Sequence, residues 1–134
     1  MLNRRIQVRI DFAKHSHVGP GKIELLEAIR HAGSLSQAAR DLKISYRHAW
    51  QLAESLKSAF QSPVTLATRG GSGGGGICLT GFGEALVDSY RTLEREFGEL
   101  AASRLQDLTA MTKEPGTLLF ALQMPITGKL DHQA

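Results

Sequence analysis

The chain has 134 residues, 42% of them hydrophobic, with a single cysteine at position 78 and a formal net charge of +3. This length allows one domain with a short extension, and a lone cysteine excludes an internal disulfide and indicates a reducing compartment. The sequence shows no signal peptide and no long apolar run, so we expect a cytoplasmic protein that is neither secreted nor embedded in a membrane.

The charge is unevenly distributed along the chain. Residues 1–79 hold 11 Lys or Arg against 5 Asp or Glu, a net charge of +6, whereas residues 80–134 hold 5 against 8, a net charge of −3. A basic first part followed by an acidic second part is typical of a protein that meets nucleic acid with the first part only.

The amino-terminal segment alternates apolar and polar residues, as a half-buried strand does. Its apolar side consists of Ile6, Val8, Ile10 and Phe12. We predict a strand that pairs with the later strands or lies along the edge of the core. His15 and His17 follow, but no acidic or sulfur partner stands at a metal-ligand spacing. We therefore expect a loop there and no metal site.

Residues 33–57 predict two short helices joined by a tight turn. Ser34 can cap the first helix, with Gln37 completing a capping box, and Ser45 can cap the second helix. Apolar residues recur at helical spacing in both segments, as Leu35, Ala38, Ala39 and Leu42, and then as Ala49, Leu52, Ala53, Leu56 and Phe60. The small alanines allow the two backbones to cross closely. This is the layout of a helix-turn-helix, whose second helix enters the major groove of DNA.

The second helix presents a polar face near its start. Arg47, His48 and Gln51 lie away from the apolar arc, and such side chains suit base edges, Arg those of guanine and Gln those of adenine. Ser45 and Tyr46 stand at the helix entry, where unpaired N–H groups favour phosphate. The alternative is an ordinary solvated face, and the paired caps together with the basic helix start weigh against it.

A glycine-rich hairpin follows the second helix. Residues 63–68 and 77–80 predict two strands, and Arg69 with the run 70–76 lies between them. A hairpin in this position is a wing, whose glycine tip can approach a sugar-phosphate backbone closely. A nucleotide-binding loop is excluded because no Lys-Ser/Thr follows the glycines and no G-x-G-x-x-G opens a helix. A flexible linker would leave two flanks too short for ordinary domains.

The predicted DNA contacts combine the helix caps, the polar face and the wing. They are Ser34, Ser36, Gln37, Ser45, Tyr46, Arg47, His48, Gln51, Arg69, Gly71, Ser72, Gly73 and Gly74.

The segment from residue 80 onwards predicts one long helix that ends before the Glu-Pro-Gly run at 114–116. About thirty residues at about 1.5 Å each give about 45 Å, more than a domain of this size spans by itself. The apolar stripe therefore needs a partner, and a second copy is the natural one, although the first two turns could pack on the chain's own core. The predicted interface residues are Leu86, Tyr90, Leu93, Phe97, Leu100, Ala101, Leu105 and Leu108.

The motifs carry a resemblance to a known family. Residues 4–108, with matching stretches at 19–29, 33–39, 44–50 and 70–83, resemble the amino-terminal DNA-binding domain of the molybdate-responsive ModE regulators, a winged helix related to that of LysR-type regulators. The Ser-Tyr-x-x-Ala-Trp motif at 45–50 and the poly-glycine wing are its most specific parts. The Mop-type modules that bind the effector in that family have no counterpart in these residues. The resemblance thus implies DNA binding but not molybdate binding, and any separate effector-sensing protein is unknown.

These patterns predict a mainly α fold with a small β-sheet, in which a winged helix-turn-helix (1–80) precedes a long dimerisation helix (81–113) and a tail of unknown role (114–134). We expect a homodimeric transcriptional regulator that binds double-stranded DNA at an inverted repeat and controls molybdenum-related genes. The alternative is a dimeric protein-interaction module that has lost DNA binding. No Ser-His-Asp, Cys-His or carboxylate constellation can be assembled, so we expect neither an enzyme nor a cofactor.

Overall fold

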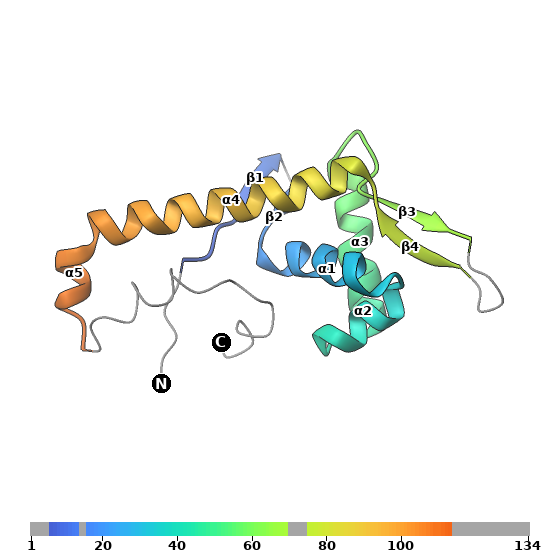
Figure 1. Cartoon of the computed structure of the whole chain (residues 1–134), viewed down its shortest axis with the longest axis horizontal. Helices are drawn as coiled ribbons and strands as arrows, with labels where there is room; N and C mark the ends of the chain where they lie inside the picture. Colours follow the sequence, from blue (N-terminus) through green and yellow to red (C-terminus); the bar gives the residue numbers. More distant parts are fainter. Residues whose placement is uncertain (1–5, 14–15, 70–74, 114–134) are drawn as a thin grey trace. The chain divides into compact units, whose positions relative to one another are not determined.

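The computed structural model describes residues 6–13, 16–69 and 75–113. Its helices and strands follow in the order β1, β2, α1, α2, α3, β3, β4, α4, α5 (Figure 1). The strands form two separate two-stranded sheets, so the predicted fold class, mainly α with a small β component, is confirmed. The described residues between 9 and 89 belong to a larger compact unit, and residues 6–8 and 90–113 belong to a smaller one.

The first sheet of the larger unit is a local hairpin. Strand β1 (Ile10–Ala13) pairs antiparallel with β2 (Ser16–Val18), so that Ile10 lies opposite Val18. The prediction was wrong in two respects. Residues 6–9 are not part of the strand, and its partner is β2, in a segment expected to be a loop, rather than the later hairpin. Pairing with the next segment along the chain closes a short loop, which costs less conformational entropy than pairing with a distant one.

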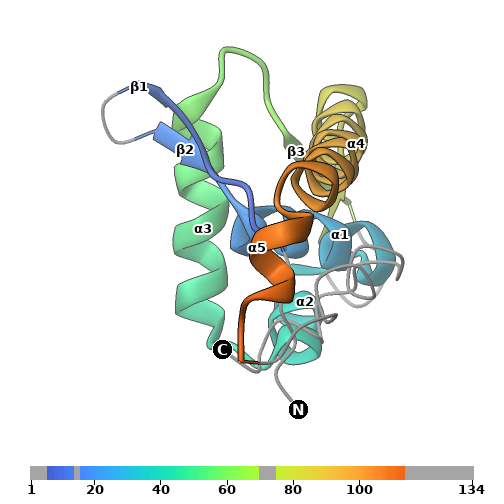
Figure 2. The ribbon, with the colours of Figure 1, turned by 90° about the vertical axis from the view of Figure 1, so that its left-hand side faces the viewer.

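Three helices form the body of the larger unit (Figures 1 and 2). Helix α1 (Pro20–Ala32) begins with proline at its first turn, where the missing N–H costs nothing, and ends at Gly33, whose φ of 77° is left-handed. Helices α2 (Leu35–Leu42) and α3 (Tyr46–Ala59) follow, and all three contact one another. Their shared core consists of Leu25, Ile29, Ala38, Ala39 and Ala49, all buried. The small side chains of the alanines allow α2 and α3 to pack closely, as expected.

The second sheet is attached to the end of α1. Strands β3 (Thr65–Thr68) and β4 (Gly76–Leu79) pair antiparallel, which confirms the predicted hairpin, with β3 two residues shorter than predicted and β4 shifted by one residue. The backbone N–H of Ile77 donates to the carbonyl oxygen of Gly33 at 3.0 Å. A Cβ at Gly76 would lie 2.6 Å from that same oxygen, so this close approach requires glycine. In Figure 1 the hairpin extends away from the three helices.

Helix α4 (Gly81–Arg104) is preceded by Thr80, which ties the start of the helix to the segment before β3. The Thr80 hydroxyl donates to the carbonyl oxygen of Pro63 at 2.7 Å and accepts from the N–H of Gly83 at 2.9 Å. Within the larger unit, the Arg30 guanidinium on α1 donates to Glu84 at 2.7 Å. This hydrogen bond raises the pKa of Arg30. The start of α4 is therefore fixed on the larger unit by a backbone contact and an ion pair.

The predicted helix was too long at its carboxyl end. Helix α4 stops at Arg104, and a short helix α5 (Gln106–Ala110) follows after Leu105. Asp107 and Thr109 are poor helix formers, and the carboxylate of Asp107 is favourable in the first turn of a new helix. The 24 residues of α4 give a rod of about 36 Å. In the three described ranges, no helix is long and apolar enough to cross a bilayer.

Candidate nucleic-acid interface

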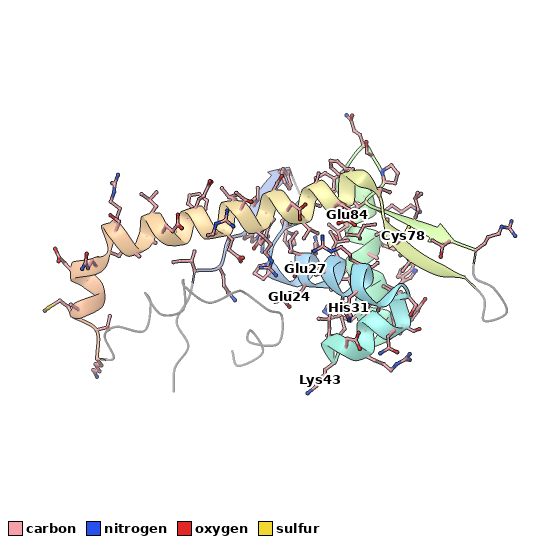
Figure 3. The ribbon with its side chains drawn as sticks, viewed as in Figure 1. Glu24, Glu27, His31, Lys43, Cys78 and Glu84 are labelled. Atoms are coloured by element: carbon pink, nitrogen blue, oxygen red, sulfur yellow. The ribbon has the colours of Figure 1, made fainter. Side chains whose placement is uncertain are left out.

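Helices α2 and α3 are each closed at the amino-terminal end by the predicted serine. The Ser34 hydroxyl accepts from the N–H of Gln37 at 3.1 Å, and the Ser45 hydroxyl accepts from the N–H of His48 at 3.0 Å. Between the helices, Lys43 adopts a left-handed φ of 60°, which turns the chain sharply. Its side chain extends away from the helices (Figure 3). The predicted caps and turn are confirmed.

The second half of the predicted capping box was wrong. The Gln37 side chain does not return to the N–H of Ser34. Its Nε2 donates to Asp41 at 2.7 Å, and its Oε1 accepts from Arg40 at 2.8 Å. Asp41 and Arg40 on the outer side of α2 bind the two ends of the Gln37 amide and hold it along the helix, away from the N–H of Ser34. Gln37 is thus already engaged on α2, whereas the Ser36 side chain at the start of that helix is exposed.

The polar face of α3 lies open as expected. Arg47, His48 and Gln51 are exposed, whereas Ala49 and Leu56 on the opposite side are buried. The guanidinium groups of Arg47 and Arg69 form no hydrogen bond or ion pair with the described residues, unlike those of Arg30 and Arg40. Both of these cations remain available to an external anion.

A cleft connects the two helix starts to the end of the hairpin next to the glycine-rich loop. It has a volume of about 280 Å³ and is lined by Ser34, Leu35, Ser36, Tyr46, Ala67, Gly75, Gly76 and Ile77. A Cβ at Gly75 would lie 2.9 Å from the carbonyl oxygen of Thr68, so glycine keeps this end of the hairpin narrow. The cleft brings together Ser34, Ser36 and Tyr46, three residues of the predicted set. Arg69 directly follows β3, and the predicted contacts at 71–74 lie outside the described residues.

One residue of this surface was not among the predicted contacts. The side chain of Trp50 is 49% exposed, and that of Tyr46, one turn earlier on α3, is 56% exposed. Residues four apart lie on the same side of a helix, so these two aromatic rings border the polar face. The available signal was the helical spacing, because Trp50 falls outside the apolar arc of α3.

The predicted interface stripe is only partly exposed in the single chain. Phe97, Leu100, Leu105 and Leu108 are exposed, while Leu86, Leu93 and Ala101 are half-buried. Tyr90 differs from the expectation that its ring is covered only by a second copy. It is already 2% exposed in the single chain, and its hydroxyl donates to the carbonyl oxygen of Val8 within the smaller unit at 2.5 Å.

In the part of the chain that the structure describes, no group of three or more His, Cys, Asp or Glu residues is placed to hold a metal ion. Cys78 on β4 is exposed (Figure 3) and lies opposite Leu66 in the hairpin register, which is also exposed. Helix caps, unpaired cations and the cleft are thus the features that the surface offers to a ligand.

Part of the chain is similar in sequence to known proteins. The chain is 35% identical over 95 residues to the transcriptional regulator ModE of Haemophilus influenzae, which covers 71% of the chain and 37% of that protein. It is 36% identical over 88 residues to the molybdenum-pterin-binding protein MopB of Rhodobacter capsulatus, 66% of the chain and 33% of that protein. The chain is related to the ModE and Mop proteins. No protein-family model matches it.

A third relative is named for DNA binding. The DNA-binding transcriptional dual regulator ModE of Escherichia coli is 38% identical over 74 residues, 55% of the chain and 28% of that protein. The matched part of the chain spans about a third of the length of these ModE and Mop relatives. These relatives support the resemblance to ModE-related proteins that the sequence motifs indicated, over part of their length.

Proposed function

We propose that the chain is a sequence-specific DNA-binding regulator of transcription, in which α2, α3 and the β3–β4 hairpin form a winged helix-turn-helix. The observation that carries this proposal is the arrangement of unpaired cations around a cleft between two helix starts. Arg47 and Arg69 have no acidic partner among the described residues, and each lies within two residues of Tyr46 or Ala67, which line the cleft together with Ser34 and Ser36. Relatives named as transcriptional regulators support the same function.

In this proposal α3 enters the major groove with its amino-terminal half. Arg47 donates to the O6 and N7 atoms of a guanine, and Gln51 pairs with an adenine, while exposed His48 reaches a neighbouring base. The Ser45 oxygen already accepts from a backbone N–H, but its hydroxyl hydrogen remains free to donate to a phosphate. Phosphates of one strand follow the cleft past Ser36, where the starts of two helices favour negative charge.

We further propose that the protein acts as a homodimer on an inverted repeat. The exposed apolar side chains of α4 and α5, among them Phe97, Leu100 and Leu108, would be buried against a second copy. Two copies of α3 then meet successive turns of the major groove, while the wings contact the flanking backbone. In this organisation residues 1–80 bind DNA and residues 81–113 hold the dimer together.

The biological role that we propose is control of molybdenum-related genes, without catalysis and without a bound cofactor. The names of the ModE and Mop relatives support the connection with molybdenum. Molybdate sensing is assigned to no residue of this chain, so the effector would act through another module or protein.

Substitution of Arg47 tests the proposed base contact. Arg47→Ala should weaken binding to the preferred duplex, selected from a random library, by about 1–3 kcal/mol, and binding to random duplex much less. Fluorescence anisotropy with the two duplexes measures both effects. Arg95→Ala removes an exposed arginine of α4 outside this surface and should leave both affinities unchanged. An equal loss on both duplexes for Arg47→Ala would make it a phosphate contact and would place specificity on Gln51 or His48.

A further inference from the structure

Leaving the large apolar ring of Trp50 exposed to water is energetically unfavourable. Its side chain is 49% exposed, and it is the one tryptophan of the chain. Of the large hydrophobic side chains that the structure shows as exposed, Tyr46 and Trp50 are those on α3. Tyr46 and Trp50 lie one turn apart and together form an exposed apolar patch beside the polar face, which makes the patch a candidate ligand contact.

The position of Trp50 on α3 limits what that ligand group can be. Arg47 precedes Trp50 by three residues, so the ring stands beside one of the two side chains proposed to contact base edges. Tyr46 lines the cleft at the helix start, whereas Trp50, one turn further along, does not. Tyr46 thus lies on the phosphate side of the surface, and Trp50 lies on the base side.

Base edges in the major groove offer mainly hydrogen-bond donors and acceptors. The apolar exception is the 5-methyl group of thymine, which apolar side chains contact in DNA complexes. An indole ring presents an apolar face wide enough to cover a methyl group and gains from removing it from water. We propose that Trp50 is a specificity-determining residue that recognises the 5-methyl group of a thymine in each half-site.

This inference rests on the proposed function, because it requires α3 to lie in the major groove. It adds an apolar contact to base recognition, which the hydrogen bonds proposed for Arg47 and Gln51 do not provide. A deoxyuridine in place of a thymine keeps every hydrogen-bonding group and removes only the methyl group. Single thymine-to-deoxyuridine replacements in the selected duplex therefore isolate the proposed contact.

The expected result is a position-specific effect that depends on Trp50. At one thymine of each half-site, deoxyuridine should weaken binding of the wild-type protein about threefold to fivefold, the factor expected for one buried methyl group. The same replacement should have no effect on Trp50→Ala, which should bind thymine and deoxyuridine duplexes equally. Circular dichroism checks that the variant is folded, as expected for an exposed side chain.

A second readout comes from the intrinsic fluorescence of Trp50 in the wild-type protein. Its emission should change on binding the thymine duplex and change less when the critical thymine is replaced. Phe12→Ala is the matched control, because Phe12 is 52% exposed but lies near Phe60, beyond the far end of α3, with ring centroids 5.5 Å apart. It should keep the full sensitivity to deoxyuridine.

Each of the other outcomes would overturn the inference on a different ground. If no thymine replacement affects the wild-type protein, or if Trp50→Ala keeps the same sensitivity, the methyl contact is overturned while DNA binding stands. If Trp50→Ala weakens binding to thymine and deoxyuridine duplexes by the same factor, and the wild-type protein does not distinguish them, the ring contacts the sugar-phosphate backbone. If the wild-type protein binds no duplex at all, the proposed function fails and this inference with it.

Discussion

Replacing Phe97 and Leu100 together by glutamate should convert the protein to a folded monomer and should reduce its affinity for the preferred duplex at least about 100-fold. The two side chains are 45% and 48% exposed in the single chain, so the substitutions should leave its fold intact. In the proposed dimer they would place unpaired carboxylates in an apolar seam opposite their symmetry mates, which is too costly to retain the interface. A monomer offers only one α3 and one wing to the DNA.

Sedimentation velocity and fluorescence anisotropy on the same preparations measure the two effects. The matched control is Thr92→Glu with Ser103→Glu, which adds two carboxylates at exposed positions on the other side of α4. This control should remain dimeric and bind DNA nearly as tightly as the wild type. A Phe97→Glu, Leu100→Glu variant that stays dimeric would place the interface elsewhere, in the amino-terminal segment or in the tail after residue 113.

Gly83→Ala should lower the free energy of unfolding by about 3 kcal/mol, near the upper end of the usual cost of overpacking. A Cβ at this position would clash with the carbonyl oxygen of Val64. That oxygen belongs to the backbone and accepts from the N–H of Thr80 at 3.0 Å, so it cannot move without loosening the start of α4. Urea unfolding followed by circular dichroism measures the change.

Gly81→Ala is the matched control for this substitution. Gly81 starts the same helix, and a Cβ there would meet nothing within 4 Å. Because alanine is the better helix former, Gly81→Ala should be neutral or slightly stabilising. Equal stability of the two variants would show that the start of α4 does not pack closely on Val64.

Local signals explain which elements could be predicted from the sequence. The two serine caps, the turn at Lys43 and the alanines of α2 and α3 act within a few residues, and the structure contains all of them. The hairpin was equally accessible, because apolar strand segments flank a glycine run. The exposed polar face of α3 followed from helical spacing alone.

The features that could not be predicted depend on contacts between residues that are distant in the sequence, or on several side chains that can bind the same group. Val8 and Tyr90 are far apart in the chain, so their hydrogen bond and the burial of Tyr90 left no local signal. Gln37 had two charged neighbours as alternatives to the predicted box, and only the folded helix shows which contact prevails. The cleft joins α2, α3 and the hairpin, and the sequence predicts each element but not their convergence.

The most direct measurement of the central claim is a footprint of the wild-type protein on DNA containing its preferred site. The account predicts two protected half-sites in inverted orientation, with centres about 10 base pairs or a multiple of this apart, since two copies of α3 meet successive major grooves. The same footprint should be lost for the Phe97→Glu, Leu100→Glu variant. Absence of any protected site on duplex DNA would contradict the account and would favour a module that binds another protein.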